Sequence, residues 1–100
     1  MKSLKVLSPQ EIDEKRRLLS PIWKYEKERL CLTIKCSHFD AAMALINAIA
    51  DLARAQNHHP KIENEYDRVS LTLWTHDCGG ITQRDFELAQ AIDALLEVPS

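Results

Sequence analysis

The chain has 100 residues, the length of one domain with a single modest hydrophobic core. Hydrophobic residues make up 45% of it and charged residues 28%, an ordinary balance for a globular protein. Its formal net charge of −2 argues against binding to nucleic acid or to an anionic membrane surface, because such proteins usually carry a basic surplus.

The cysteines and the hydropathy pattern point to a reducing compartment. Cys31, Cys36 and Cys78 are odd in number and include no Cys-x-x-Cys pair, so no disulfide framework is expected. No stretch approaches the roughly 20 apolar residues that span a bilayer, and no N-terminal apolar run resembles a signal peptide. We therefore expect a cytoplasmic protein that needs neither disulfides nor metal to fold.

The first predicted helix begins after Ser8. Ser8 can cap the free N–H groups, proline suits the first turn, and Glu11 completes a capping box. We expect this helix to carry Ile12, Leu18 and Leu19 and to stop at Ser20-Pro21.

Two short strands are expected next, at residues 22–25 and 30–36, with the charged tetrad 26–29 at the tip of their hairpin. In the second strand, alternation places four residues on one face, namely Leu30, Leu32, Ile34 and Cys36.

The most periodic segment predicts a long helix, with His38 as its entry residue and a stop at residues 57–60. Its apolar residues recur at three- and four-residue spacing, as in a single buried stripe. The stripe comprises Phe39, Ala42, Met43, Ile46, Ile49, Ala50 and Ala53.

A second pair of strands follows, at residues 61–66 and 69–76, with a turn at Asp67-Arg68 between them. Cys78-Gly79-Gly80 breaks the last strand, and a capping box from Thr82 to Asp85 opens the final helix. The buried stripe of that helix comprises Phe86, Ala89, Ile92 and Leu96.

The order helix, two strands, helix, two strands, helix predicts one α+β domain over residues 1–100. With connections of hairpin length, the strands form a four-stranded antiparallel sheet with the helices packed on one face, a two-layer sandwich.

Three histidines lie at the ends of predicted elements, where a scaffold positions reactive groups. His58 and His59 follow the long helix and His76 ends the last strand. Histidine can transfer protons in both directions near neutral pH. Pro60 restrains His59 to an extended backbone, so both histidines line one pocket only if His58 keeps a helical or turn geometry. The alternative is two surface histidines at a helix C-terminus.

These residues fall into a specific spacing: His58-His59-Pro60, five residues, Tyr66, nine residues, His76, eight residues, Asp85. Together with the segments 64–69, 73–80 and 82–85, this pattern resembles the signature of the pterin-4a-carbinolamine dehydratase family. The resemblance covers the chain from Leu7 onward and includes the order of elements.

The resemblance implies an α+β fold that assembles into homodimers or homotetramers, in which neighbouring protomers extend one another's sheet. It also implies dehydration of 4a-hydroxytetrahydropterin to quinonoid dihydropterin, which recycles the cofactor of aromatic amino-acid hydroxylases. Carried over by position, the pterin site has Asn57, His58 and His59 on one side, Trp74, Thr75, His76 and Asp77 on the other, and Asp85 nearby.

The implied chemistry suits histidine. Losing water from a carbinolamine requires a proton delivered to the leaving hydroxyl and a proton removed from a ring nitrogen. We expect His58 and His76 to be the acid–base pair, with His59 orienting or binding the substrate. The reaction needs no electron transfer and no Lewis acid, so neither a cofactor nor a metal is expected.

Several of these residues also have simpler structural interpretations. Asp85 can cap the last helix, and Thr75 falls on the apolar side of its strand and can pack in the core. Trp74 can stack on a pterin or fill an interface. Asp77 can be a turn residue, and Tyr66 an aromatic residue at the edge of the core.

Three positions depart from the family pattern. Arg54 stands where many members carry an acid, Asn57 replaces a common aspartate, and Ile62 stands where tryptophan is frequent. If the long helix persists to its end, Arg54 shares a face with His58 and disfavours its protonation. These departures bear on pterin affinity, pH optimum and substrate preference.

Two rival interpretations remain. One is a non-catalytic pterin-binding or protein-interaction module of the same fold, similar to the transcriptional cofactors among the family's animal members. The other is a metal hydrolase that uses His58, His59, His76 and Cys78, although adjacent histidines lack the usual metal-site spacings.

Overall fold

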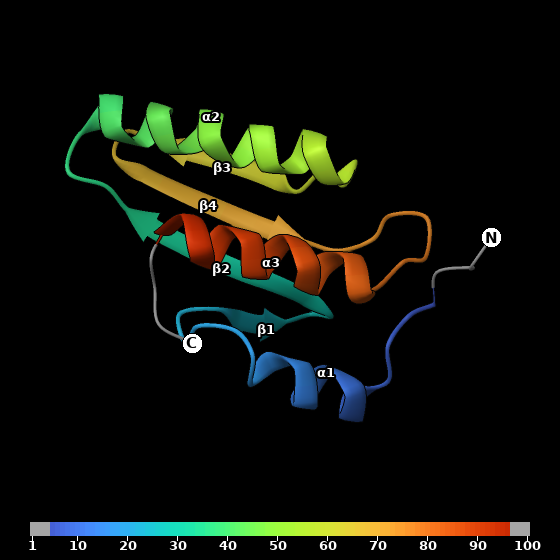
Figure 1. Ribbon diagram of the computed structural model, residues 1–100. Coiled ribbons are helices and arrows are strands. Elements are labelled where there is room, and N and C mark those ends of the chain that lie inside the picture. The colour runs from blue at the N-terminus through green and yellow to red at the C-terminus, as the bar shows by residue number, and fades with distance from the viewer. Residues whose placement is uncertain (1–4, 97–100) are drawn as a thin grey trace.

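An antiparallel sheet of four strands is the framework of the protein in the computed structural model, which describes residues 5–96 (Figure 1). The strands lie in the order β1-β2-β4-β3, so β2 and β4 join the two hairpins at the centre of the sheet. The elements are α1 (Pro9–Arg16), β1 (Lys24–Glu26), β2 (Arg29–Lys35), α2 (Phe39–Gln56), β3 (Lys61–Glu65), β4 (Arg68–Leu73) and α3 (Gln83–Leu96). This order confirms the predicted α+β class.

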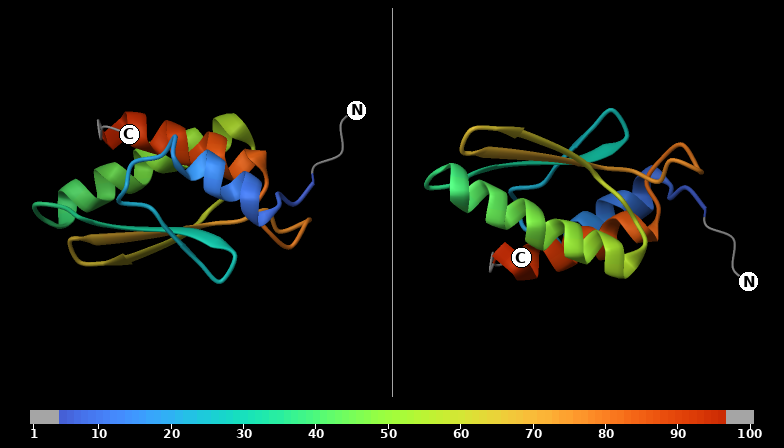
Figure 2. Two further views of the ribbon diagram at one scale, coloured as in Figure 1. Left: turned by 90° about the horizontal axis from the view of Figure 1, so that it is seen from below. Right: turned by 90° about the horizontal axis from the view of Figure 1, so that it is seen from above.

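All three helices lie on one face of the sheet, as the views from below and from above show (Figure 2). Alternate residues of the central strands point toward the helices and are buried, namely Leu30, Leu32, Val69, Leu71 and Leu73. The helices meet them with Ala42, Ile49, Phe86, Leu88, Ala89 and Ile92. Burying one large aliphatic side chain contributes roughly 1.5–3 kcal/mol, so this layer is a major source of the fold's stability.

The predicted helix starts are confirmed. Ser8 Oγ accepts from the N–H of Glu11 at 3.1 Å, and Glu11 Oε1 accepts from the N–H of Ser8 at 2.9 Å. The hydrogen bonds from Ser8 hold the pKa of Glu11 below its usual value. At the start of α2, His38 Nδ1 accepts from the N–H of Ala41 at 3.1 Å, so His38 is the helix-entry residue.

The end of α1 differs from the prediction. The helix ends at Arg16, and the chain continues in tighter turns whose N–H groups bond three residues back. These turns leave Leu18 58% exposed while Leu19 is buried. Because β1 begins only at Lys24, Ile22 is exposed as well. The expectation was wrong for Leu18 and for the start of this strand.

A buried carboxylate fastens the connection between α1 and β1 to α3. Asp93 Oδ2 accepts from the backbone N–H of Ser20, and Asp93 Oδ1 accepts from Nε1–H of Trp23, both at 2.8 Å. Asp93 therefore has partners for both oxygens, which is what a buried carboxylate requires.

The helical stripe of α2 is confirmed in its middle and wrong at its start. Ala42, Ile49 and Ala53 are buried, whereas Phe39 is 43% exposed. Tyr66 is 68% exposed rather than at the edge of the core, and its ring stacks on that of Phe39 with centroids 6.4 Å apart. Phe39 is the first residue of α2 and Tyr66 lies in the turn between β3 and β4, so their rings meet at the surface.

Tight turns close both hairpins. Lys27 and Glu28 connect β1 to β2 with φ angles of 50° and 61°, the left-handed pair of a type I′ turn. The second turn comprises Tyr66 and Asp67, one residue earlier than predicted, because Arg68 already pairs with β3.

No helix within residues 5–96 is both long and apolar enough to cross a bilayer. No disulfide joins the cysteines Cys31, Cys36 and Cys78 in this range.

Candidate active site

The end of α2 turns His58 into the protein. Asn57 follows the last helical residue in the left-handed conformation, with φ 49° and ψ 45°. The N–H of Asn57 then bonds the carbonyl of Arg54 at 3.1 Å, and the N–H of His58 bonds that of Ala53 at 3.0 Å. This pair of bonds is a Schellman motif, in which asparagine is the usual substitute for glycine. His58 is thereby 7% exposed, while His59 remains at the surface.

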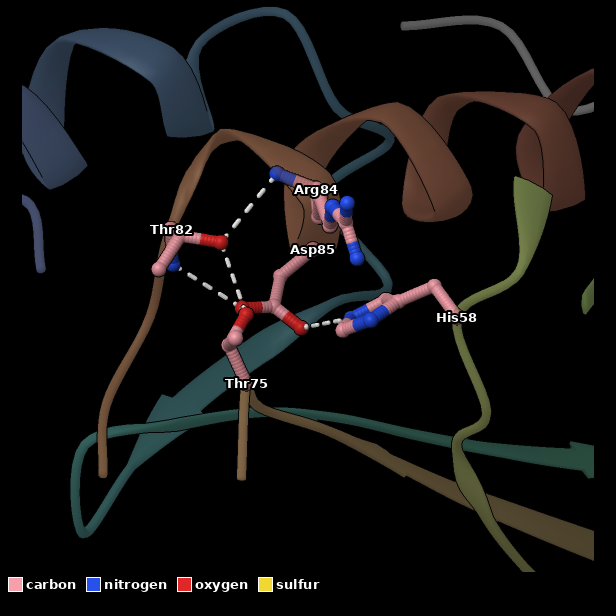
Figure 3. Close-up of polar contacts among 5 residues, drawn as sticks. All are labelled: His58, Thr75, Thr82, Arg84 and Asp85. Atoms are coloured by element: carbon pink, nitrogen blue, oxygen red, sulfur yellow. Dashed lines mark hydrogen bonds and ion pairs between the residues drawn. The ribbon is translucent and has the colours of Figure 1, made fainter. Parts of the chain in front are cut away.

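His58 is held by a buried aspartate (Figure 3). Its Nε2 lies 2.6 Å from Oδ1 of Asp85, a residue with no exposed surface. On the other side of the carboxylate, Oδ2 accepts from the hydroxyl of Thr75 and from the N–H of Thr82, both at 2.9 Å. Asp85 therefore joins the end of α2 to the start of α3 and to the segment after β4.

The hydrogen bonds of this cluster have one consistent direction. Each threonine hydroxyl has a single hydrogen. Thr75 gives its hydrogen to Asp85, so in the 2.7 Å contact between the hydroxyls of Thr75 and Thr82, Thr82 donates. The Thr82 oxygen in turn accepts from the N–H of Arg84 at 3.3 Å. Every group is satisfied when Asp85 is an acceptor only.

The tautomer of His58 follows from that direction. With Asp85 as acceptor, Nε2 of His58 carries the hydrogen and donates it, and neutral imidazole then holds its lone pair at Nδ1. The short, charge-assisted contact fixes the orientation of the ring. Nδ1 is therefore the nitrogen of His58 that can act as an acceptor, while Nε2 is engaged by Asp85.

The same aspartate begins α3. Thr82 precedes the helix, and its N–H donates to the carboxylate three residues later, as in a capping box. The hydroxyl oxygen of Thr82 accepts from the N–H of Arg84, whereas in a capping box it would accept from the N–H of Asp85. Capping and holding His58 are therefore two tasks of one carboxylate, and the predicted cap at Asp85 is confirmed.

The histidines surround a depression of about 320 Å³. The residues that line it are Asn57, His58, His59, Thr75, His76, Asp77 and Arg84. Most of the residues predicted for the two sides of a pterin site thus lie around one hollow.

Two predicted residues lie next to the depression rather than on its wall. Asp85 is fully buried behind His58. Trp74 is partly buried and lines a separate groove, and its ring contacts that of His76 with centroids 4.2 Å apart. Thr75 combines both of its interpretations, since it is buried in the core and lines the hollow.

Arg84 is a lining residue that the sequence interpretation missed. The signal for it was present, because the residue before Asp85 lies in the first turn of the last helix, beside the predicted cap. Its guanidinium is the one permanent positive charge among the lining residues.

Arg54 does not act as the sequence suggested. α2 ends at Gln56, before His58, so the two side chains do not share a helical face. The guanidinium of Arg54 pairs instead with Asp51 at 2.8 Å, and both side chains are exposed.

Within residues 5–96, no three histidine, cysteine, aspartate or glutamate side chains are grouped as they would be to hold a metal ion.

Comparison with known proteins identifies the family. The model of the pterin 4 alpha carbinolamine dehydratase family matches residues 5–95. The chain belongs to this family. A protein of Acidobacterium capsulatum, provisionally named a pterin-4-alpha-carbinolamine dehydratase, is 46% identical over 90 residues, which are 90% of this chain and 97% of that protein. A relative from Chloroflexus aurantiacus with the same provisional name is 45% identical over 76% of this chain and 82% of its own.

A solved structure agrees with the fold. The crystal structure of a protein from Brucella melitensis, described as a transcriptional coactivator/pterin dehydratase, superposes with a TM-score of 0.85 at 30% identity. The match covers 91% of this chain and 98% of that one.

Proposed function

We propose that this protein is a hydro-lyase that converts 4a-hydroxytetrahydropterin to quinonoid dihydropterin and water. The names of the family and of its relatives support the reaction. The observation that carries the mechanism is the contact between His58 and Asp85, which leaves Nδ1 of His58 available to accept a proton. His58 and His76 line the same hollow.

In the proposed reaction, Nδ1 of His58 removes the proton from the ring nitrogen next to the carbinol carbon. His76 delivers a proton to the hydroxyl, the carbon–oxygen bond breaks, and the nitrogen lone pair forms the new carbon–nitrogen double bond. One hydrogen and one hydroxyl leave as water, so atoms and electrons balance. Each of the two proton transfers contributes typically ~10²–10⁴-fold to the rate.

The remaining lining residues have binding roles in this proposal. His59, Asn57 and Asp77 all line the hollow and are available to hold the substrate. Arg84 offers donors to the carbonyl oxygen of a pterin ring, a contact that arginine makes in a fixed planar geometry. Asp85 positions His58 and does not touch the substrate.

The test is the decay of freshly generated 4a-hydroxytetrahydropterin in the presence of the purified protein. The proposal predicts a rate well above the spontaneous one, unaffected by a metal chelator. A rate equal to the spontaneous one would contradict it, and loss of activity and of one equivalent of bound metal with the chelator would favour a metal hydrolase.

A second role as a protein-interaction module has one observation in its favour. The related Brucella melitensis structure is described as a transcriptional coactivator as well as a pterin dehydratase. If the chain were only a binding module, it would bind a stable pterin analogue in calorimetry and still leave the decay of the carbinolamine at its spontaneous rate.

We also propose that the protein acts in the cytoplasm as a homodimer or homotetramer and recycles the cofactor of an aromatic amino-acid hydroxylase. β1 and β3 are the outer strands of the described sheet, where a neighbouring copy could pair. Light scattering after size-exclusion chromatography tests the assembly, and a monomer would contradict it.

A further inference from the structure

A stack of three side chains leads from the open face of the sheet to His76. The His76 ring contacts the Trp74 ring at a centroid distance of 4.2 Å, with their planes inclined by 34°. The guanidinium carbon of Arg29 lies 4.0 Å from the centroid of the same indole. The two rings are in direct contact, and the guanidinium is well inside the reach of about 6 Å of a cation–π contact.

The sheet explains why these three residues meet. Leu30 in β2 pairs with Leu73 in β4, so one step further along the antiparallel register Arg29 lies opposite Trp74. Trp74 and His76 are two residues apart, and in extended chain such residues point to the same side. Thr75 between them points the other way, into the core, where it bonds Asp85.

We propose that Arg29 and Trp74 are positioning residues that hold the His76 ring at the edge of the histidine depression. His76 lies at the start of an exposed turn, where a side chain would otherwise sample several rotamers. The indole supplies a flat surface against which the imidazole rests. The guanidinium in turn fixes the indole, which is only partly buried.

This proposal assigns Trp74 a task different from stacking on a pterin. Trp74 lines a groove of about 740 Å³ on the sheet side of the turn, together with Arg29, and it does not line the histidine depression. It therefore acts on the substrate through His76. The kinetic consequence rests on the proposed dehydratase function, whereas the position of the ring does not.

Nuclear magnetic resonance of the free protein tests the position of the ring. An imidazole stacked on an indole has ring protons shifted upfield by the indole ring current. The His76 signals are identified by their loss in His76→Gln. They should show the full upfield shift in wild type and a smaller upfield shift in Trp74→Phe. They should lose it in Trp74→Ala and lose part of it in Arg29→Gln. Unchanged His76 signals in Trp74→Ala would overturn the proposal.

Kinetics test the consequence. Trp74→Ala should lower kcat about 10-fold or more with KM within about two-fold, since a misplaced catalytic group costs turnover rather than binding. Arg29→Gln should lower kcat about three-fold, and Trp74→Phe should restore most of the activity because it restores a flat surface. A raised KM with unchanged kcat in Trp74→Ala would overturn the proposal in favour of direct stacking on the substrate.

Arg16→Gln is the matched control. It removes an arginine that lies 5.8 Å from the ring of Tyr25, away from the histidines, and should leave kcat and the His76 signals unchanged. If the wild-type protein shows no turnover, the dehydratase proposal fails, and the magnetic resonance result alone decides whether the stack holds His76.

Discussion

Nε2 of His58 lies 2.6 Å from Oδ1 of Asp85, and this contact connects the end of α2 with the start of α3. His58 lines the depression, and its Nε2 donates this hydrogen bond to the buried carboxylate. The carboxylate is acceptor to both hydroxyl and backbone donors on its other side, so the imidazole has one available tautomer.

Asp85→Asn should lower kcat by about 10–10²-fold. The amide can donate to Nε2 of His58, which permits the tautomer with its hydrogen on Nδ1, and that tautomer cannot act as a base toward the substrate. Stability should also fall, by about 1–3 kcal/mol, since the cap of α3 and the bond from Thr75 are weakened in a fully buried position. Urea unfolding and steady-state kinetics measure the two effects. Wild-type kcat in the folded variant would contradict the assignment.

His58 and His76 should differ in their effect on folding. His58 is 7% exposed and hydrogen-bonded, so His58→Ala leaves the carboxylate of Asp85 without one partner and should destabilise the protein by about 1–3 kcal/mol. His76 is exposed, and His76→Ala should change the unfolding free energy by less than about 0.5 kcal/mol. Equal losses of stability in the two variants on denaturant unfolding would contradict a structural role for the buried His58.

Asn57 should tolerate glycine and resist other residues. Its φ of 49° lies in the left-handed region, where a side chain other than that of asparagine or aspartate costs roughly 1–2 kcal/mol. We expect Asn57→Ala to lose about 1 kcal/mol of stability, and Asn57→Gly to keep the stability of the wild type. Thermal unfolding distinguishes them, and an Asn57→Ala variant more stable than Asn57→Gly would contradict the turn.

Arg54→Glu should leave the pH profile of kcat/KM unchanged. The guanidinium pairs with Asp51 on the exposed side of α2, and the helix ends before His58. Exposed pairs of this kind contribute about 0–1 kcal/mol, so the variant should also remain folded. A shift of the acidic limb on measuring the profile at low salt would mean that Arg54 reaches the site after all.

The sequence predicted the class of the fold because its local signals agree with one another. Alternation in β2 and β4 and the capping box at Ser8 are local patterns, and the structure follows them. Leu18 and Phe39 were assigned wrongly because periodicity does not show where a helix ends or how deeply its first residue is buried.

The sequence indicated most of the residues around the depression but not the contacts between their side chains. The family resemblance implied that His58 and His76 belong to one site, but their contacts depend on tertiary structure. Asp85 reaches His58 only because Asn57 reverses the chain, a conformation that asparagine permits and does not require. The stack of Arg29 on Trp74 depends on strand register.

The central claim is that His58 and His76 form an acid–base pair, and the most direct measurement is the steady-state dehydration rate of His58→Gln and His76→Gln beside wild type. Arg54→Glu is the control, because it changes a charge near the end of α2 without touching the depression. The account predicts that each histidine variant loses at least ~10²-fold in kcat while remaining folded, and that Arg54→Glu keeps the wild-type rate. Near-wild-type turnover in either histidine variant would contradict it.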